Sequence, residues 1–199
     1  MDRKIILTDY DGVLGDWENH FHTWMRARGY AQKQQGFYHV EDLYGISAIE
    51  GKRMVCEFNN SAWIGWMPAL RDARSGIATL YENGYNFVCV TSLSSDPYAK
   101  ELRWQNIRHL FGNEAFVDLV CLETGANKDQ ALAPYQGSGL YWLEDLPKNA
   151  VLGADLGLNT IIVDHAFNRE LNDSRIRRAK SWREIAGIIL NERQHSRAA

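Results

Sequence analysis

Short apolar runs without alternation, each ending in polar residues, constrain the fold of this 199-residue chain most strongly. Strands that are covered on both faces give such runs, whereas half-exposed strands alternate apolar and polar residues. The runs are residues 5–8 before Asp9, 87–90 before Thr91 and Ser92, 140–143 before Glu144 and Asp145, and 161–163 before Asp164. The pattern predicts a parallel sheet buried between helices.

Helical patterns lie between several of these runs. Residues 69–82 are expected to form a helix that stops at Asn83-Gly84, and residues 97–111 another that stops at Gly112. A further strand is expected at 116–121 and a final helix at 182–190. This alternation predicts an α/β fold, in which the polar residues that follow the strands meet at one edge of the sheet and form a ligand crevice.

Residues 16–66 interrupt the alternation. Trp17, Phe21, Trp24 and Met25 follow a helical stripe, and Gly29 is its stop signal. Few strand-like runs follow before residue 67. We therefore expect a mostly helical cap at 16–66, inserted after the first strand and lying over the crevice. Residues 1–15 and 67–199 would form the α/β core.

The composition excludes several kinds of partner. A net charge of −3 argues against a long nucleic acid, which usually requires a basic face. Three widely spaced cysteines are expected to pack in the core and fit a reducing compartment. No stretch is apolar enough to cross a membrane, and no signal-peptide pattern is present. We expect a cytoplasmic protein that acts on a small molecule.

The segment Asp9-Tyr10-Asp11-Gly12-Val13 carries the most chemical information. Two acids directly after a buried strand are costly unless a cation neutralises them. With Thr91, a lysine and Glu144-Asp145 following in order, the segment resembles the signature of the haloacid dehalogenase-like phosphatases. That resemblance implies a Rossmann-like parallel core with a cap, Mg²⁺ as cofactor, and a phosphate monoester as substrate.

The resemblance also implies roles for the acids. Asp9 would be the nucleophile that forms an aspartyl-phosphate, and Asp11 the general acid and base, with its carboxyl pointing away from the metal. Asp9, the backbone carbonyl of Asp11 and Asp145 would hold Mg²⁺, which prefers oxygen ligands. Glu144 replaces the first aspartate of the family's acidic pair and is expected to support the metal ligands rather than touch the metal.

The remaining motif residues would bind the phosphate. Gly12 allows a tight turn that brings amide groups toward it, and Thr91 would donate its hydroxyl, with Ser92 beside it. A lysine completes the charge balance, and two compete for this role. We expect Lys100, in a Tyr-x-Lys segment that resembles the deoxyribonucleotidase branch, and keep Lys128 as the alternative.

Three further segments resemble the deoxyribonucleotidases: "DGVLGDW" at 11–17, "GWMPALRDA" at 65–73, and "IIVDHAFNRELNDSRIRRAKSW" at 161–182. The implied substrate is a 5′- or 3′-deoxyribonucleoside monophosphate. Cap aromatic side chains would stack on the base. The candidates for this stacking are Trp17, Tyr44, Trp63 and Trp66. A homodimer is left open.

Two rival functions remain at this level. One is a related phosphatase for a 3′-phosphorylated nucleic-acid end or a small sugar phosphate. The other is a non-catalytic member that binds a nucleotide or a protein. Outside the motifs, the basic run Arg175, Arg177, Arg178 and Lys180 is interpreted as a solvated helix face, and His165 as structural.

Overall fold

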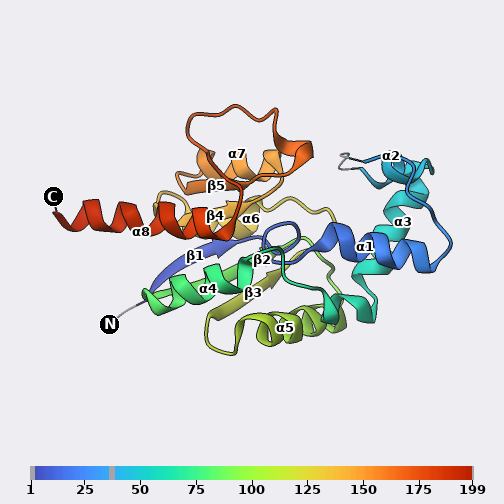
Figure 1. Cartoon of the computed structure of the whole chain (residues 1–199), viewed down its shortest axis with the longest axis horizontal. Coiled ribbons are helices and arrows are strands. Elements are labelled where there is room, and N and C mark those ends of the chain that lie inside the picture. The colour runs from blue at the N-terminus through green and yellow to red at the C-terminus, as the bar shows by residue number, and fades with distance from the viewer. Residues whose placement is uncertain (1–2, 36–38, 199) are drawn as a thin grey trace.

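The computed structural model describes residues 3–35 and 39–198, and a six-stranded parallel sheet forms its centre (Figure 1). The strands are β1 (Lys4–Thr8), β2 (Tyr85–Thr91), β3 (Phe116–Cys121), β4 (Tyr141–Glu144), β5 (Asn159–Val163) and β6 (Arg177–Ala179). Their order is β3-β2-β1-β4-β5-β6, and every pairing is parallel. The order reverses between β1 and β4, which is where α/β sheets bind their ligands. The predicted fold class is confirmed.

Both faces of the sheet are buried. Ile6, Phe87 and Leu143 point to the larger apolar cluster, while Leu7 and Trp142 point to a smaller cluster on the opposite face. This is the two-residue period of a strand with apolar residues in both phases. It explains why the strand sequences do not alternate apolar with polar residues.

Helices cover the two faces unequally. α4 (Ala73–Glu82), α5 (Pro97–Phe111) and α8 (Trp182–Ala198) pack on the larger cluster. α6 (Asp129–Leu132), the 3-10 turn η2 (Ala133–Tyr135) and α7 (Pro147–Asp155) cover the smaller one. α5 and β3 have the predicted bounds, while α4 begins at Ala73, four residues later than expected, because residues 69–72 form the return from the cap.

Four helical segments follow β1 and form a cap-like region at the carboxyl end of the strands (Figure 1). They are α1 (Trp17–Ala27), α2 (Val40–Tyr44), α3 (Ala48–Asn59) and the 3-10 helix η1 (Ala62–Trp66). Phe21, Trp24 and Phe58 are fully buried and pack ring against ring between α1 and α3. The aromatic stripe of the sequence therefore builds the interior of the cap.

The two linkers of the cap lie side by side. The backbone N–H of Asp16 donates to the carbonyl of Pro68 at 2.9 Å, and that of Leu70 donates to the carbonyl of Leu14 at 2.8 Å. A segment inserted into a domain has to leave and re-enter it at neighbouring points, and these two hydrogen bonds join those points. The limits at 16 and 66 stay a prediction. Within 3–35 and 39–198, no helix has the length and apolar character needed to span a membrane.

The prediction made for the basic run near the C-terminus is wrong. Its residues were interpreted as one face of a helix, but Arg177–Ala179 is the edge strand β6, paired with β5. Arg178 is only partly exposed and donates to Asp164 and Asn168. The guanidinium of Arg178 therefore stabilises the fold. The presence of several basic residues in a row does not indicate this role.

Candidate active site

Asp9 and Lys128 form a buried ion pair at the reversal point of the sheet. Asp9 follows β1 directly, and its backbone N–H donates to the carbonyl of Leu143 on β4 at 2.8 Å. Lys128 Nζ lies 2.8 Å from Asp9 Oδ2 and 2.8 Å from Glu144 Oε2. Burial raises the pKa of Asp9 to about 8 although Lys128 acts in the opposite direction. The lysine is 1% exposed, so solvent screens its contacts with the two acids little.

Glu144 and Asp145 end β4 and differ in their hydrogen bonds. Glu144 Oε1 accepts from the backbone N–H groups of Asp145 and Leu146 at 3.0 Å each, and its Oε2 accepts from Lys128. Both oxygens of Glu144 are therefore satisfied by the protein. Burial and the neighbouring acids Glu144 and Asp9 raise the pKa of Asp145 well above its usual range. Within the described residues, Asp145 is the acid of this cluster without an ion pair to a basic side chain.

These acids fit a divalent metal ion. Carboxylate oxygens of Asp9, Glu144 and Asp145 lie within 4.8 Å of one another and are buried or nearly so. Oxygen donors of this kind are what Mg²⁺ prefers, and three clustered acids with one lysine leave negative charge for it to neutralise. The expectation that Glu144 only supports the ligands agrees with its saturated oxygens, and the ligand assignment itself stays a prediction.

Gly12 makes the close approach of the two strand ends possible. Its φ is +73°, and a Cβ built there would lie 2.0 Å from Asp145 Oδ2. The turn is closed by backbone N–H groups of Val13, Leu14 and Gly15, which all donate to the carbonyl of Tyr10. A residue other than glycine would push the Asp145 carboxylate out of the acidic cluster. Only the lack of a side chain at residue 12 allows Asp145 to sit here.

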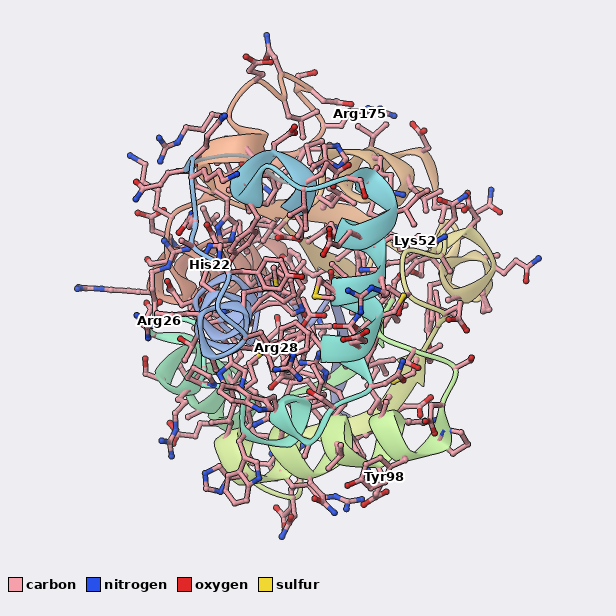
Figure 2. The ribbon with its side chains drawn as sticks, turned by 90° about the vertical axis from the view of Figure 1, so that its right-hand side faces the viewer. His22, Arg26, Arg28, Lys52, Tyr98 and Arg175 are labelled. Carbon is pink, nitrogen blue, oxygen red and sulfur yellow. The ribbon has the colours of Figure 1, made fainter. Side chains whose placement is uncertain are left out.

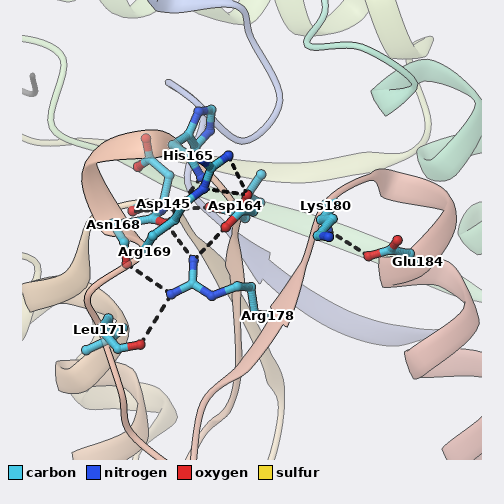
Figure 3. Close-up of polar contacts among 10 residues, drawn as sticks. Asp145, Asp164, His165, Asn168, Arg169, Leu171, Arg178, Lys180 and Glu184 are labelled. Carbon is cyan, nitrogen blue, oxygen red and sulfur yellow. Dashed lines mark hydrogen bonds and ion pairs between the residues drawn. The ribbon is translucent and has the colours of Figure 1, made fainter. Parts of the chain in front are cut away.

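A loop after β5 holds both acid-bearing loops in place (Figure 3). His165 Nε2 donates to the carbonyl of Gly12 at 2.7 Å. Asn168, which is buried in η3 (Ala166–Asn168), donates to the carbonyls of Asp145 and Val163 at 2.8 and 2.7 Å. Arg178 in turn donates to Asn168 Oδ1 at 2.6 Å and to Asp164 Oδ1 at 3.0 Å. The structural role expected for His165 therefore has a specific target, the turn at Gly12.

Asp11 has a partner that the sequence analysis missed. Its Oδ1 accepts from Nη2 of Arg103 on α5 at 2.8 Å, and this arginine is fully buried. Burial raises the pKa of Asp11, and Arg103 opposes that rise. An arginine in the middle of a helix gives no sign in the sequence that it faces inward, 92 residues from its partner.

Thr91 and Ser92 end β2 beside the acids. Thr91 Oγ1 is buried and has no hydrogen-bond partner in the part of the chain that the structure describes. A buried hydroxyl without a partner is costly, and it is explained if a ligand oxygen completes the bond. Ser92 Oγ instead donates to the carbonyl of Ala126 at 2.8 Å, so this hydroxyl serves the loop before Lys128.

A cavity of about 560 Å³ opens in front of these groups. Core residues form its floor, among them Asp9, Asp11, Thr91, Lys128 and Asp145. Cap residues form its other wall, among them Trp17, Val40, Leu43, Lys52 and Val55. Lys52 projects from α3 in Figure 2 and shares this cavity with Gly125 and Ala126 of the core. A cavity of this size exceeds what a bare phosphate needs and has room for an organic group.

Lys100, the lysine preferred in the sequence analysis, lies away from this cavity. Lys100 is exposed in the first half of α5 and does not line this cavity, whereas Lys128 bridges Asp9 and Glu144. Its near neighbour Tyr98 is likewise at the surface, 58% exposed (Figure 2). Lys100 and Tyr98 lie on the exposed side of α5, whereas Ala99 and Arg103 of the same helix are buried. The alternative, Lys128, is the lysine that the structure places at the site.

Three of the four predicted stacking residues lie elsewhere. Trp17 lines the cavity, and its ring stacks on Phe21 with centroids 4.5 Å apart. Tyr44 is buried against His22, Trp63 packs on His20, and Trp66 is 73% exposed beside His109. The sequence analysis expected all four rings to stack on a base. Tyr44 and Trp63 instead pack against other cap residues, and Trp66 lies at the outer surface.

The acidic cluster predicts a clear response of stability to metal. Saturating Mg²⁺ is expected to stabilise the native chain by about 2.7 kcal/mol at a hundred times the dissociation constant, which corresponds to a rise of roughly 5–10 °C in Tm. Asp145→Asn removes one of the crowded charges and should raise Tm in EDTA while abolishing the Mg²⁺ response. Asp118→Asn, exposed on β3, is the matched control and should respond to Mg²⁺ as the native chain does. Differential scanning calorimetry checks this, and an Mg²⁺ response that survives Asp145→Asn would contradict the metal site.

Comparison with known proteins identifies the fold. No protein-family model and no curated protein match the sequence. A haloacid dehalogenase-like hydrolase from Streptococcus pneumoniae is 13% identical with a TM-score of 0.65, over 94% of this chain and 98% of its own. A D,D-heptose 1,7-bisphosphate phosphatase from B. bronchiseptica, solved with magnesium and phosphate, is 15% identical with a TM-score of 0.58, over 95% and 99%. The L-2-haloacid dehalogenase PA0810 is 13% identical with a TM-score of 0.58, over 95% and 100%.

The chain therefore has the fold of the haloacid dehalogenase-like superfamily, as the order of its motifs indicates. These identities establish the fold alone. The same fold carries a phosphatase and a dehalogenase among the three, so the reaction has to be argued from the site of this chain.

Proposed function

We propose that this protein is a Mg²⁺-dependent phosphatase that hydrolyses a phosphate monoester through an aspartyl-phosphate on Asp9. The observation that carries the proposal is the acidic cluster of Asp9, Glu144 and Asp145 around Lys128, open to a cavity. The phosphatase from B. bronchiseptica with this fold was solved with magnesium and phosphate, which supports the same chemistry. Bound Mg²⁺ would neutralise the repulsion between a carboxylate and a phosphate dianion.

Each residue of the site has its own role in the two steps of the proposed reaction. An oxygen of Asp9 attacks phosphorus while Asp11 gives a proton to the leaving oxygen. Asp11 then takes a proton from water, which attacks phosphorus, and the bond from Asp9 to phosphorus breaks. Lys128 and the hydroxyl of Thr91 would compensate charge on the phosphoryl oxygens. Gly12, held by His165, keeps the turn and Asp145 in register.

A dehalogenase is the second candidate, because PA0810 has this fold. A 2-haloacid brings one negative charge to the site, on a carboxylate next to the reacting carbon, whereas a phosphate monoester brings a dianion at the reacting phosphorus, so displacement of a halide needs no dication. Three clustered acids would then be a cost without a function. The cluster therefore favours the phosphatase, and chloride release from 2-chloropropionate without metal would favour the dehalogenase.

For the substrate we propose a deoxyribonucleoside monophosphate. The cavity has room for a nucleoside, its cap wall combines apolar residues such as Val40, Leu43 and Val55 with polar ones, and Trp17 offers an aromatic ring. The test measures kcat/KM on a panel of deoxyribonucleotides, ribonucleotides, sugar phosphates and a 3′-phosphorylated oligonucleotide. Deoxyribonucleoside monophosphates should rank first. A higher kcat/KM for a sugar phosphate or for the oligonucleotide would select the rival phosphatases, and binding without turnover would select the non-catalytic alternative.

Trp17 should contribute specifically to nucleotide binding. An aromatic face that stacks on a base contributes about 1–3 kcal/mol, so Trp17→Leu is expected to raise KM for a nucleotide by about 5- to 150-fold. KM for a small alkyl phosphate should stay within about twofold, since that ester has no base to stack. Trp66→Leu is the matched control and should change neither, because Trp66 lies outside the cavity. Equal losses for both substrates would contradict stacking at Trp17.

A further inference from the structure

Arg103 is a buried cation that the mechanism above does not use. It lies on α5 and is fully buried. Nη2 donates to Asp11 Oδ1 at 2.8 Å, Nη1 contacts Met67 Sδ at 3.6 Å, and the guanidinium carbon lies 3.7 Å from the ring centre of Tyr10. Burying a guanidinium is costly unless hydrogen-bond acceptors and aromatic faces replace its contacts with water, and Asp11 Oδ1 and the ring of Tyr10 do so here.

The same face of α5 ties the catalytic turn to the cap linker. Asn106, three residues after Arg103, accepts a hydrogen bond from the Tyr10 hydroxyl. Its amide donates to the carbonyls of Gly65 and Met67 at 3.3 and 3.0 Å. Residues three apart share a helix face, so one patch of α5 fixes Tyr10, Asp11 and the linker together. Arg103 is the member of this patch that reaches the reacting carboxylate.

We propose that Arg103 is a positioning residue that fixes the carboxylate of Asp11 for proton transfer; this rests on the proposed phosphatase function. Arg103 holds Oδ1, which leaves Oδ2 for the substrate. The proton on Oδ2 passes to the leaving oxygen as its bond to phosphorus breaks, and Oδ2 later takes a proton from the attacking water. Arg103 exchanges no proton. A shift of about 1 Å in a catalytic group can cost about 100-fold in rate, so holding this carboxylate matters.

The test compares esters that do and do not need the proton. kcat/KM reports the steps up to transfer of the phosphoryl group to Asp9, in which Asp11 acts as acid. Arg103→Met is expected to lower kcat/KM about 100-fold for an alkyl phosphate, whose alkoxide leaves poorly, and less than about fivefold for p-nitrophenyl phosphate. Arg108→Met, exposed on the same helix, is the matched control and should leave both values unchanged. An equal loss for both esters, as a purely structural role would give, overturns the proposal.

A second comparison isolates the path through Asp11. In an Asp11→Asn background, Arg103→Met should lower the residual kcat/KM by no more than about twofold, because residues that act as a unit are not additive. A loss as large as in the native background overturns the proposal. If Arg103→Met does not fold, Arg103→Lys replaces it and should also lower kcat/KM more for the alkyl ester; an unchanged ratio between the esters overturns the proposal. Failure of the phosphatase function itself would appear earlier, as no Mg²⁺-dependent phosphate release by the native chain.

Discussion

Replacing Lys128 by Met should lower kcat/KM for phosphate esters by about 100- to 1,000-fold, the effect of removing one positioned charge from a dry site. Lys128 Nζ contacts Asp9 and Glu144 at 2.8 Å each, and solvent screens these contacts little because the lysine is 1% exposed. Without it, the nucleophile loses its orienting partner and the phosphoryl oxygens lose a cation. Phosphate release at saturating Mg²⁺ gives the measurement.

The same change should destabilise the fold. Removing one member of a buried ion pair leaves an uncompensated charge, which costs about 3–5 kcal/mol. Chemical denaturation at a temperature where the variant is folded separates this loss from the loss of rate. Lys100→Met is the matched control, since Lys100 is exposed on α5, and it should change rate and stability little. If Lys100→Met abolished activity and Lys128→Met did not, the lysine assignment from the sequence would be right and the present one wrong.

Gly12→Ala is expected to remove Mg²⁺ binding and activity together. A Cβ at residue 12 would lie 2.0 Å from Asp145 Oδ2 and 2.8 Å from its Cγ, so the Asp145 carboxylate has to leave its position. Losing one of the acids that hold a metal ion typically removes binding at millimolar concentrations, since Mg²⁺ sites use only one or two carboxylates. Isothermal titration with Mg²⁺ and phosphate-release assays both report this change.

Backbone strain alone would not produce that result. A left-handed conformation costs a residue with a Cβ about 1–2 kcal/mol wherever it occurs. Gly29 has a φ of +83°, and a Cβ there would meet nothing within 4 Å from elsewhere in the described residues, so Gly29→Ala carries the strain without the clash. It should lose stability but keep Mg²⁺ binding and activity. Retained Mg²⁺ affinity in Gly12→Ala would show that Asp145 is not a ligand.

The strands and the acids at their ends were the parts that the sequence predicted best. The apolar run 87–90 lies in β2, which is buried on both faces, and burial of this kind selects apolar residues at successive positions. The acids follow these strands without a gap, so knowing a strand end places Asp9, Glu144 and Asp145 at one edge. Topology alone then brings the cluster together.

The lysine and the arginine could not be predicted in the same way. Lys128 is the residue just before the short helix α6, and its contact with Asp9 depends on how the loop after β3 returns over the sheet. Arg103 occupies a helix position whose neighbours in sequence are mixed, and its contacts come from distant residues, Tyr10, Asp11 and Met67. The partners of long side chains are set by the tertiary structure. The neighbouring residues in the sequence therefore say little about which acid a lysine or arginine will contact.

The cap aromatics show a different limit. Aromatic residues fill apolar interiors as readily as they bind ligands, and a small helical cap needs its own core. Phe21, Trp24 and Phe58 supply that core, and Tyr44 packs against Phe21. A stripe of rings in sequence thus predicts the existence of the cap but not which ring faces the cavity. Only Trp17 among the four candidates does so.

The central claim is that an oxygen of Asp9 accepts the phosphoryl group. It is tested most directly by mixing the protein with Mg²⁺ and a ³²P-labelled ester, quenching in acid within one turnover, and locating the label by peptide mass spectrometry. The account predicts an acid-stable, alkali-labile label on the peptide that contains Asp9, and neither label nor phosphate release in Asp9→Asn. Full phosphate release by Asp9→Asn, or a label on another residue of the native chain, would contradict it.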